Sequence, residues 1–203
     1  MKHVISRFFV LAFCLLLLLP AAGHAGTSPP RDQLQTSIDA ILAILKDDSL
    51  KGEAHMALRR EVLRKKIHER FDFEKMSQFS LGRHWRDKTT EERQTFVALF
   101  SLLLENTYVG KIESYTDEQV MYVKEMVRDD KAQIDTIIVT DSIEIPIDYR
   151  MYQTDDGEWM VYDLVVEGVS LVANYRSQFT QMLDSGTFES LILELEKKIE
   201  SNS

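Results

Sequence analysis

The sequence WMVYDLVVEGVSLVANYRSQF, residues 159–179, determines the fold that we expect for this chain. Its first half, up to Val166, consists almost entirely of β-branched and aromatic residues, which is typical of a strand. Glu167-Gly168 interrupts this pattern. Apolar residues then recur at helical spacing, at Leu171, Tyr175, Phe179 and Met182. This spacing predicts an amphipathic helix, so the strand should pass through one tight corner into a helix that folds back over the sheet.

Three segments before this stretch also have the two-residue period of strands. The four expected strands are Val120–Val127, Ala132–Thr140, Ile143–Met151 and Glu158–Val166. Short polar sequences of the kind found in turns separate them, which indicates an antiparallel meander. In the third strand one face is apolar and should be buried: Ile143, Ile145, Ile147, Tyr149 and Met151. Pro146 lies on its other face and cannot donate to a ladder, so we expect a bulge or an edge there.

Helical periodicity precedes and follows these strands. Four helical segments are expected before the sheet, covering about 34–45, 53–69, 71–81 and 89–108, and two after it, carrying Leu171–Met182 and Phe188–Ile199. Thr89 and Glu92 have the spacing of a capping box at the start of the fourth segment. The sequence therefore predicts an α+β domain: a four-stranded antiparallel meander packed on one face by about six helices.

More large apolar side chains are present than a thin layer of sheet and helices needs. The helix that contains Phe96 is apolar nearly all round, and few small residues alternate with the bulky ones. For any single aromatic residue, a place in the core is the simpler explanation. Together they favour a hydrophobic cavity between sheet and helices, similar to the NTF2-like cone. The candidate ligand contacts are Phe96, Phe100, Leu103, Ile138, Ile145, Ile147, Tyr149, Val161, Val165, Leu171, Tyr175 and Phe179.

Residues 1–25 have the pattern of a secretory signal peptide. Lys2 and Arg7 precede an unbroken apolar run of 12 residues, 8–19, and Gly23-His24-Ala25 forms a small-residue cleavage site before Gly26. An uncleaved anchor is the alternative, but the run is short for a permanent span. We expect residues 26–203 to form a single domain. That domain has no cysteine, because the only one, Cys14, lies in the leader.

The charge of this domain disfavours two classes of partner. Without the two basic residues of the leader, 22 basic and 33 acidic residues remain, a net charge of −11 with neutral His. Such a surface repels nucleic acid and anionic lipid headgroups. A protein that visits membranes and leaves them again tolerates this charge, as does an ordinary soluble protein.

Motifs for catalysis and metal binding are absent from the sequence. It contains no nucleophile elbow, dinucleotide-binding loop, phosphate-binding loop or zinc-protease motif, and no histidine after the leader has a second histidine or a cysteine at i+3 or i+4. We therefore predict no catalytic residues, no metal and no enzyme activity. One alternative is a small NTF2-like enzyme that uses Asp163 as a base. A structural hydrogen-bonding role for a buried Asp163 is the simpler interpretation.

A second alternative rests on the basic side of the second helix. This face runs from Arg59 to Lys66 and is the only basic cluster in an acidic protein. Charge runs of this kind are usually solvated. The alternative is a non-binding adaptor protein that docks through this face onto an acidic partner.

Several stretches resemble one known family. They are Ile145-Pro146-Ile147-Asp148-Tyr149-Arg150, Trp159, Val161-Tyr162-Asp163, Glu167-Gly168-Val169-Ser170-Leu171-Val172 and Asn174-Tyr175-Arg176-Ser177-Gln178-Phe179. They resemble the MlaC family of periplasmic phospholipid-binding proteins, also called toluene-tolerance proteins. Gly82-Arg83-His84-Trp85-Arg86 is similar to the G-R-Y-W-R segment of that family, with His84 where an aromatic hydroxyl is usual. The resemblance covers nearly all of the chain after the leader.

This resemblance implies a monomeric periplasmic carrier that moves glycerophospholipids between the outer and inner membranes and so maintains outer-membrane lipid asymmetry. Its partners would be an inner-membrane ABC transporter with an MCE-type subunit and an outer-membrane lipoprotein–porin complex. Both acyl tails would enter the pocket between sheet and helices, with the headgroup outside. No cofactor is implied, because the bound phospholipid is cargo.

Overall fold

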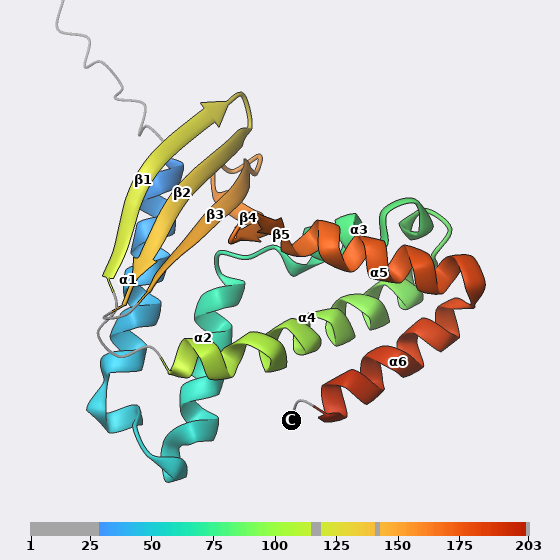
Figure 1. Ribbon diagram of the computed structural model, residues 1–203, viewed down its shortest axis with the longest axis horizontal. Helices are drawn as coiled ribbons and strands as arrows, with labels where there is room; N and C mark the ends of the chain where they lie inside the picture. The colour runs from blue at the N-terminus through green and yellow to red at the C-terminus, as the bar shows by residue number, and fades with distance from the viewer. Residues whose placement is uncertain (1–28, 115–118, 141–142, 202–203) are drawn as a thin grey trace, which may run out of the picture.

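The computed structural model describes residues 29–114, 119–140 and 143–201 (Figure 1). The predicted signal peptide lies outside these residues. Within the described part of the chain, every helix is too short or too polar to cross a bilayer.

The chain begins with a helical hairpin. Helix α1 (Pro30–Lys46) starts with Pro at its first position, where the missing amide hydrogen has no cost. Two 3₁₀ turns, η1 (Asp48–Leu50) and η2 (Glu53–His55), lead into α2 (Met56–His68), which packs along α1. Gly52, between the two turns, has a φ of +88°, a conformation that glycine adopts without strain.

Four further helices form a second helical group. They are α3 (Phe73–Leu81), which runs into the 3₁₀ turn η3 (Gly82–Trp85), α4 (Thr90–Glu113), α5 (Leu171–Ser185) and α6 (Phe188–Ser201). The capping box at the start of α4 is confirmed: the Thr89 hydroxyl accepts from the Glu92 amide, and the Glu92 carboxylate accepts from the Thr89 amide. Helix α4 extends five residues beyond the predicted end near Tyr108.

The sheet is an antiparallel meander with the order β1-β2-β3-β4-β5. Its strands are β1 (Gln119–Arg128), β2 (Lys131–Val139), β3 (Glu144–Gln153), β4 (Trp159–Val166) and β5 (Val169–Ser170). The α+β class and the six helices are confirmed, but the sheet has five strands where we expected four. Glu167 and Gly168 both have positive φ, 50° and 81°, and form a two-residue turn that pairs Val166 with Val169. The predicted corner is therefore a short hairpin.

A bulge in β4 turns two residues to the face of the sheet opposite Val161. Arg150 pairs with Asp163 and Met151 pairs with Val161, so that Tyr162 is an extra residue in β4. Beyond this bulge, Asp163 and Val165 lie on the opposite face from Val161, because each shares its face with its partner on β3. Val165, one of the candidate ligand contacts, therefore lies on the other face of the sheet from Val161.

Pro146 lies at a local edge of β3. No register shift occurs at this residue, and the Glu167 amide donates to its carbonyl at 3.0 Å. The regular pairing of β3 with β4 ends one residue later, at Ile147 and Val166. The missing amide hydrogen of Pro146 therefore falls beyond the last β3–β4 residue pair, as expected for an edge position. Ile143, which was expected on the buried face, precedes β3 and is exposed.

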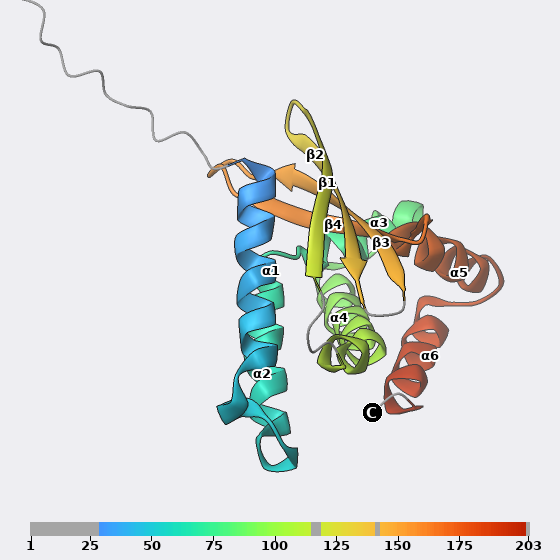
Figure 2. The same ribbon diagram turned by 60° about the vertical axis from the view of Figure 1, so that its left-hand side comes forward.

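One side of the sheet, here called the inner face, packs against α1 (Figure 2). The buried residues of this sheet cluster are Leu34, Ile38, Ala132, Ile134, Tyr149, Met151, Trp159 and Val161. Arg70 supports the contact by donating to the Gln33 side chain at 2.9 Å, the Ser37 hydroxyl at 2.9 Å and the Trp159 carbonyl at 2.6 Å. Helix α1, the end of α2 and the sheet are thus tied together around one guanidinium group.

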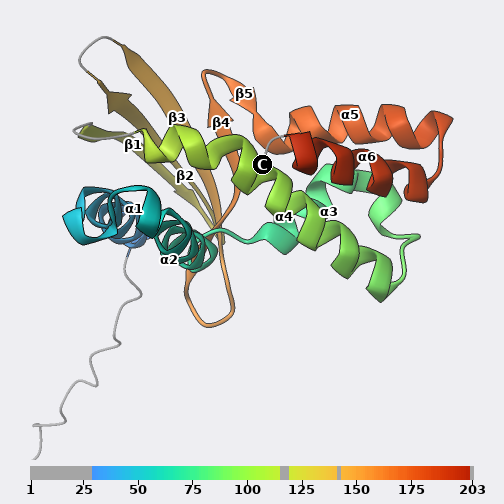
Figure 3. The same cartoon turned by 90° about the horizontal axis from the view of Figure 1, so that it is seen from below.

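Helices α3, α4, α5 and α6 enclose a second core, the helical cluster. Its largest fully buried members are Phe96, Phe100, Met76, Leu81, Leu191 and Leu195. Figure 3 shows α3, α5 and α6 beyond the β4–β5 edge of the sheet, while α4 extends back toward α1 and α2. Phe71 and Leu164 pack against both clusters and connect them.

Replacing Leu34 with Ala is expected to lower the free energy of unfolding by about 2–5 kcal/mol, because a fully buried side chain is lost from the α1–sheet contact. Urea unfolding followed by circular dichroism measures this change. Thr36→Ala, on the exposed side of the same helix, is the matched control and should change stability by less than about 0.5 kcal/mol. Equal losses in the two variants would contradict the assigned packing of α1.

Candidate functional site

The structure divides the twelve candidate ligand contacts into two groups and leaves one apart. Ile138, Ile145, Ile147, Tyr149 and Val161 lie on the inner face of the sheet. Phe96, Phe100, Leu103, Leu171, Tyr175 and Phe179 belong to the helical cluster. Val165 is buried on the opposite face of the sheet. Among the residues that the structure describes, Phe71 and Leu164 pack against both clusters and connect the two groups.

The aromatic members of the helical cluster contact one another directly. The ring centroids of Phe100 and Tyr175 are 5.0 Å apart, and the Phe179 ring is 5.5 Å from each of Phe96 and Phe100. Phe96 and Phe100 are completely buried. Burial also raises the pKa of the Tyr175 hydroxyl, which lies beside Thr107. In this structure these side chains form a filled core, as expected for close-packed interiors.

The sheet group is less completely covered. Ile138 pairs with Ile145 across β2 and β3, and Val120 pairs with Ile138 across β1 and β2. Ile145, Ile147 and Val120 are only half-buried. These four residues form an apolar patch, here called the inner-face patch, near the start of β1, the end of β2 and the start of β3. Figures 1 and 2 show this end of the sheet near the C-terminal end of α4. A ligand would displace fewer packed side chains at this patch than among the aromatic rings of the helical cluster.

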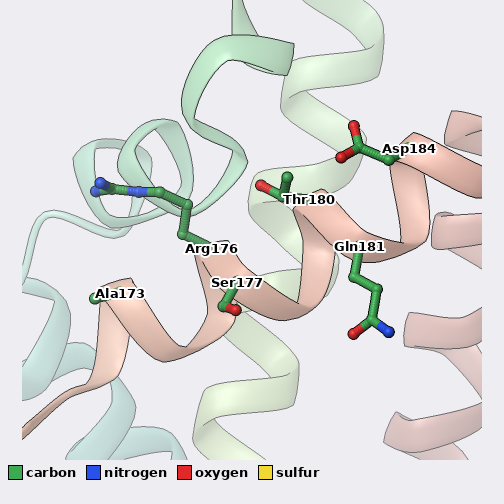
Figure 4. Close-up of a pocket in the computed structure, with 6 residues that line it drawn as sticks. All are labelled: Ala173, Arg176, Ser177, Thr180, Gln181 and Asp184. Carbon is green, nitrogen blue, oxygen red and sulfur yellow. The ribbon is translucent and has the colours of Figure 1, made fainter.

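Two surface pockets lie elsewhere. One follows α5 and is lined by Ala173, Arg176, Ser177, Thr180, Gln181 and Asp184, whose side chains are spaced along that helix (Figure 4). The other lies between α4 and α6 and includes Glu91, Phe188, Ile192 and Leu193. Neither of these two pockets is lined by a candidate contact. The enclosed cavity between sheet and helices therefore stays a prediction.

The two motif-like segments around Gly82 and Arg176 meet outside the helical cluster. Arg176 donates to the Phe79 carbonyl at 2.6 Å, and a Cβ on Gly82, whose φ is +56°, would lie 3.4 Å from the Arg176 side chain. Arg83 forms an ion pair with Asp184. These contacts hold η3 against α5. The Gly82 and Arg176 segments therefore lie together for a structural reason, since each packs against the other.

Asp163, the candidate base, is a structural carboxylate in this fold. It is 3% exposed and accepts three hydrogen bonds: from Arg150 at 3.0 Å, from the Ser170 hydroxyl at 2.7 Å and from the Val172 amide at 3.0 Å. The Ser170 hydroxyl in turn accepts from the Ala173 amide and caps α5. Asp163 therefore joins β3, β4 and β5 to the first turn of α5, and the geometry supports the structural interpretation over the catalytic one.

The basic side of α2 is turned toward α4. Glu113 accepts from Arg59 and Arg60, with the shortest distances 3.0 Å in each case. Glu105 accepts from Arg64 at 2.5 Å and lies 3.0 Å from His68 Nε2. Burial alone would raise the pKa of Glu113, but the hydrogen bonds from Arg60 and Arg59 outweigh burial and lower that pKa below its ordinary value.

These ion pairs weaken the argument for an adaptor surface, because all three arginines are already paired with carboxylates of α4. The pairs join residues up to 54 positions apart, so no local sequence signal could reveal them. Among the residues that the structure describes, no group of three or more His, Asp or Glu side chains is placed to hold a metal ion.

Comparisons with known proteins agree with this architecture. A sequence model of the family described as MlaC protein matches residues 35–197, from α1 to α6. The intermembrane phospholipid transport system binding protein MlaC of Haemophilus influenzae is 21% identical over 195 residues, covering 94% of this chain and 91% of that protein. A solved structure of the phospholipid-binding protein from Ralstonia solanacearum, in complex with a phospholipid, is similar with a TM-score of 0.78 and 25% identity. It covers 86% of this chain and 99% of that chain.

Asp163→Asn is expected to lower the free energy of unfolding by about 1–3 kcal/mol, because the amide cannot accept all three hydrogen bonds and leaves Arg150 without its ion pair. Denaturant unfolding measures the loss, and Asp148→Asn on the adjacent strand is the control. The Asp148 side chain forms no hydrogen bond or ion pair with the residues that the structure describes, so its replacement should not destabilise the fold. A neutral effect of Asp163→Asn would contradict the structural role.

Asp148 should in fact reduce stability above its own pKa. Burial first, and then the neighbouring Asp135, raise the pKa of Asp148 above its ordinary value. A raised pKa in the folded state means that folding binds a proton, so this contribution to stability falls as pH rises through the raised pKa. Compared with the natural chain, Asp148→Asn should gain relative stability as pH rises above the usual aspartate pKa of about 4, until the raised folded-state pKa has been passed. Thermal unfolding across this range tests the sign, and a relative loss would contradict it.

Proposed function

This chain belongs to the MlaC family, and from that premise we propose that it is a periplasmic phospholipid carrier that shuttles glycerophospholipids between the outer and inner membranes. The observation that carries the proposal is the likeness, over most of both chains, to a protein solved with a bound phospholipid. The named relative from an intermembrane phospholipid transport system supports the same function. We place this activity in one lipid-binding domain, residues 26–203, after removal of the signal peptide.

The physical problem for such a carrier is the exposure of hydrocarbon to water. Burying one methylene group is worth about 0.8 kcal/mol, so two acyl chains with about 30 methylenes cost on the order of 20 kcal/mol to expose. A carrier must replace the bilayer with an apolar interior of similar quality. It needs no catalytic group and no cofactor, and the phospholipid is its cargo. This matches a chain whose best enzymatic candidate, Asp163, is occupied by three structural hydrogen bonds.

We place the tails between the inner-face patch and the helices that face it. Half-buried Ile145 and Ile147 lie on the sheet side, while partly buried Ile67 of α2 and Tyr108 of α4, which pack against the helical cluster, supply apolar surface on the helical side. Entry requires the sheet cluster and the helical cluster to separate beyond their common residues, Phe71 and Leu164. The other candidate contacts in the helical cluster would be reached only as this opening widens.

The partners follow from the same proposal. We expect an inner-membrane ABC transporter with an MCE-type subunit and an outer-membrane lipoprotein–porin complex, with the carrier monomeric between visits. The acidic surface supports release from anionic membranes, because like charges repel.

Native mass spectrometry of the gently purified mature protein should show an additional mass of phospholipid size. Ile145→Glu should reduce this lipid-bound fraction severalfold, because it places a charge on the inner-face patch. Ile145 is half-buried, so the variant should still fold. Met121→Glu is the matched control, since Met121 is 45% exposed and its side chain lies on the other face of the same sheet.

A ligand-free spectrum of the natural chain would contradict the carrier function. Equal lipid occupancy in the Ile145 and Met121 variants, with both folded by circular dichroism, would instead contradict only the placement of the tails.

A further inference from the structure

Three arginines of α2 face only two carboxylates of α4. Arg59 and Arg60 each direct Nε and Nη2 to one oxygen of Glu113, at 3.0–3.3 Å. Arg64 donates to Glu105. These five side chains are here called the arginine clasp. With neutral His68, the clasp has a surplus of one positive charge in a chain whose net charge is −9.

The clasp is partly accessible to a ligand. The side chains of Arg60 and Arg64 are 44% and 50% exposed, whereas Glu113 is 10% exposed and Arg59 is 18% exposed. Glu113 is the last residue of α4, so its carboxylate can swing into solvent when the guanidinium groups release it. Arginines that already hold a carboxylate through two donors each have the geometry that also fits phosphate oxygens.

The position of the clasp relates it to the proposed lipid site. Glu113 lies six residues before Gln119, where β1 begins, and the next residue, Val120, belongs to the inner-face patch. Figures 1 and 2 both show the C-terminal end of α4 beside α2 and next to the ends of β1 and β2. A lipid with its tails on the inner-face patch would therefore have its polar end near α2.

We propose that the arginine clasp binds the phosphate group of the phospholipid, with Arg59 and Arg60 transferring from Glu113 to the phosphate oxygens. This inference rests on the proposed carrier function and adds a headgroup site to it. In the absence of lipid, Glu113 takes the place of the anion. The single negative charge of a phosphodiester neutralises the surplus charge of the clasp. The same site would accept any glycerophospholipid, because the contact is to the phosphate that all of them share.

The two sides of the clasp give opposite predictions. Removing the arginines removes the phosphate site, whereas Glu113→Gln removes the internal competitor and leaves the arginines available. A purely structural clasp would lose stability in both cases and would weaken all lipids alike. The sign of the Glu113 effect therefore separates a binding role from a structural one.

The experiment compares two soluble lipids with the same tails, dihexanoylphosphatidylcholine and dihexanoylglycerol, with inorganic phosphate as a third probe. Dissociation constants are measured by calorimetry on the delipidated mature protein. The ratio of the two lipid constants reports the contribution of the phosphocholine headgroup, because the tail contribution cancels. The natural chain should prefer the phospholipid. Arg59→Gln/Arg60→Gln should reduce this preference about tenfold, equivalent to about 1.4 kcal/mol, and Glu113→Gln should increase it.

Arg83→Gln is the matched arginine control, since it also breaks an ion pair, with Asp184, but on the far side of the helical group. It should leave the preference unchanged. An unchanged ratio in the clasp variants, or a Glu113→Gln variant that weakens both lipids equally, would overturn the headgroup site alone. Inorganic phosphate binding as tightly as the phospholipid would assign the site to free phosphate and overturn the lipid assignment. Failure of the natural chain to bind either lipid would overturn the carrier function as well.

Discussion

The structure depends on β4 serving two apolar cores at once. Backbone hydrogen bonds hold the chain after α2 against this strand. The Asp72 amide donates to the Val161 carbonyl at 2.9 Å, and the Val161 amide donates to the Arg70 carbonyl at 2.8 Å. Phe71, between them, packs against both clusters, as does Leu164 three residues farther along β4. The strand therefore positions the α1–α2 hairpin on its inner face and the α3–α6 group beyond its edge. Any widening of the space between the two groups must occur around this fixed strand.

The bulge at Tyr162 is what allows one strand to have both roles. Without it, Asp163 would point into the apolar sheet cluster with Val161, where an ionised carboxylate would be costly. The extra residue turns Asp163 to the other face, where Arg150, Ser170 and the amide of Val172 satisfy it. These bonds set the direction of α5 as it leaves β5. A local irregularity in the strand thus determines where the helical group lies relative to the sheet.

Much of this fold could be predicted from the sequence, and the errors have physical causes. Long periodic segments such as α4 are recognised because one side of each must be buried, and the Thr89 capping box fixes where α4 begins. The sequence contains enough information to predict the hairpin at Glu167-Gly168, since two residues between apolar strands are typical of a tight turn. The bulge at Tyr162 and the pairing of Arg60 with Glu113 cannot be predicted in this way, because each depends on a partner that is distant in the sequence. Site residues on opposite sides of a bulge therefore cannot be assigned by counting along the strand.

A filled aromatic cluster is compatible with a carrier if the ligand does not enter there first. Apolar side chains close over any space that holds no ligand, because a void loses their mutual contacts. Separating the completely buried rings of Phe96 and Phe100 would forfeit a large contact area. The half-buried Ile145 and Ile147 lose much less, because part of their surface already faces water. Opening should therefore begin at the inner-face patch, where partly exposed apolar side chains are stabilised by contact with an acyl tail. It should advance toward the aromatic rings of the helical cluster only as the bound acyl tail replaces the side-chain contacts that are broken.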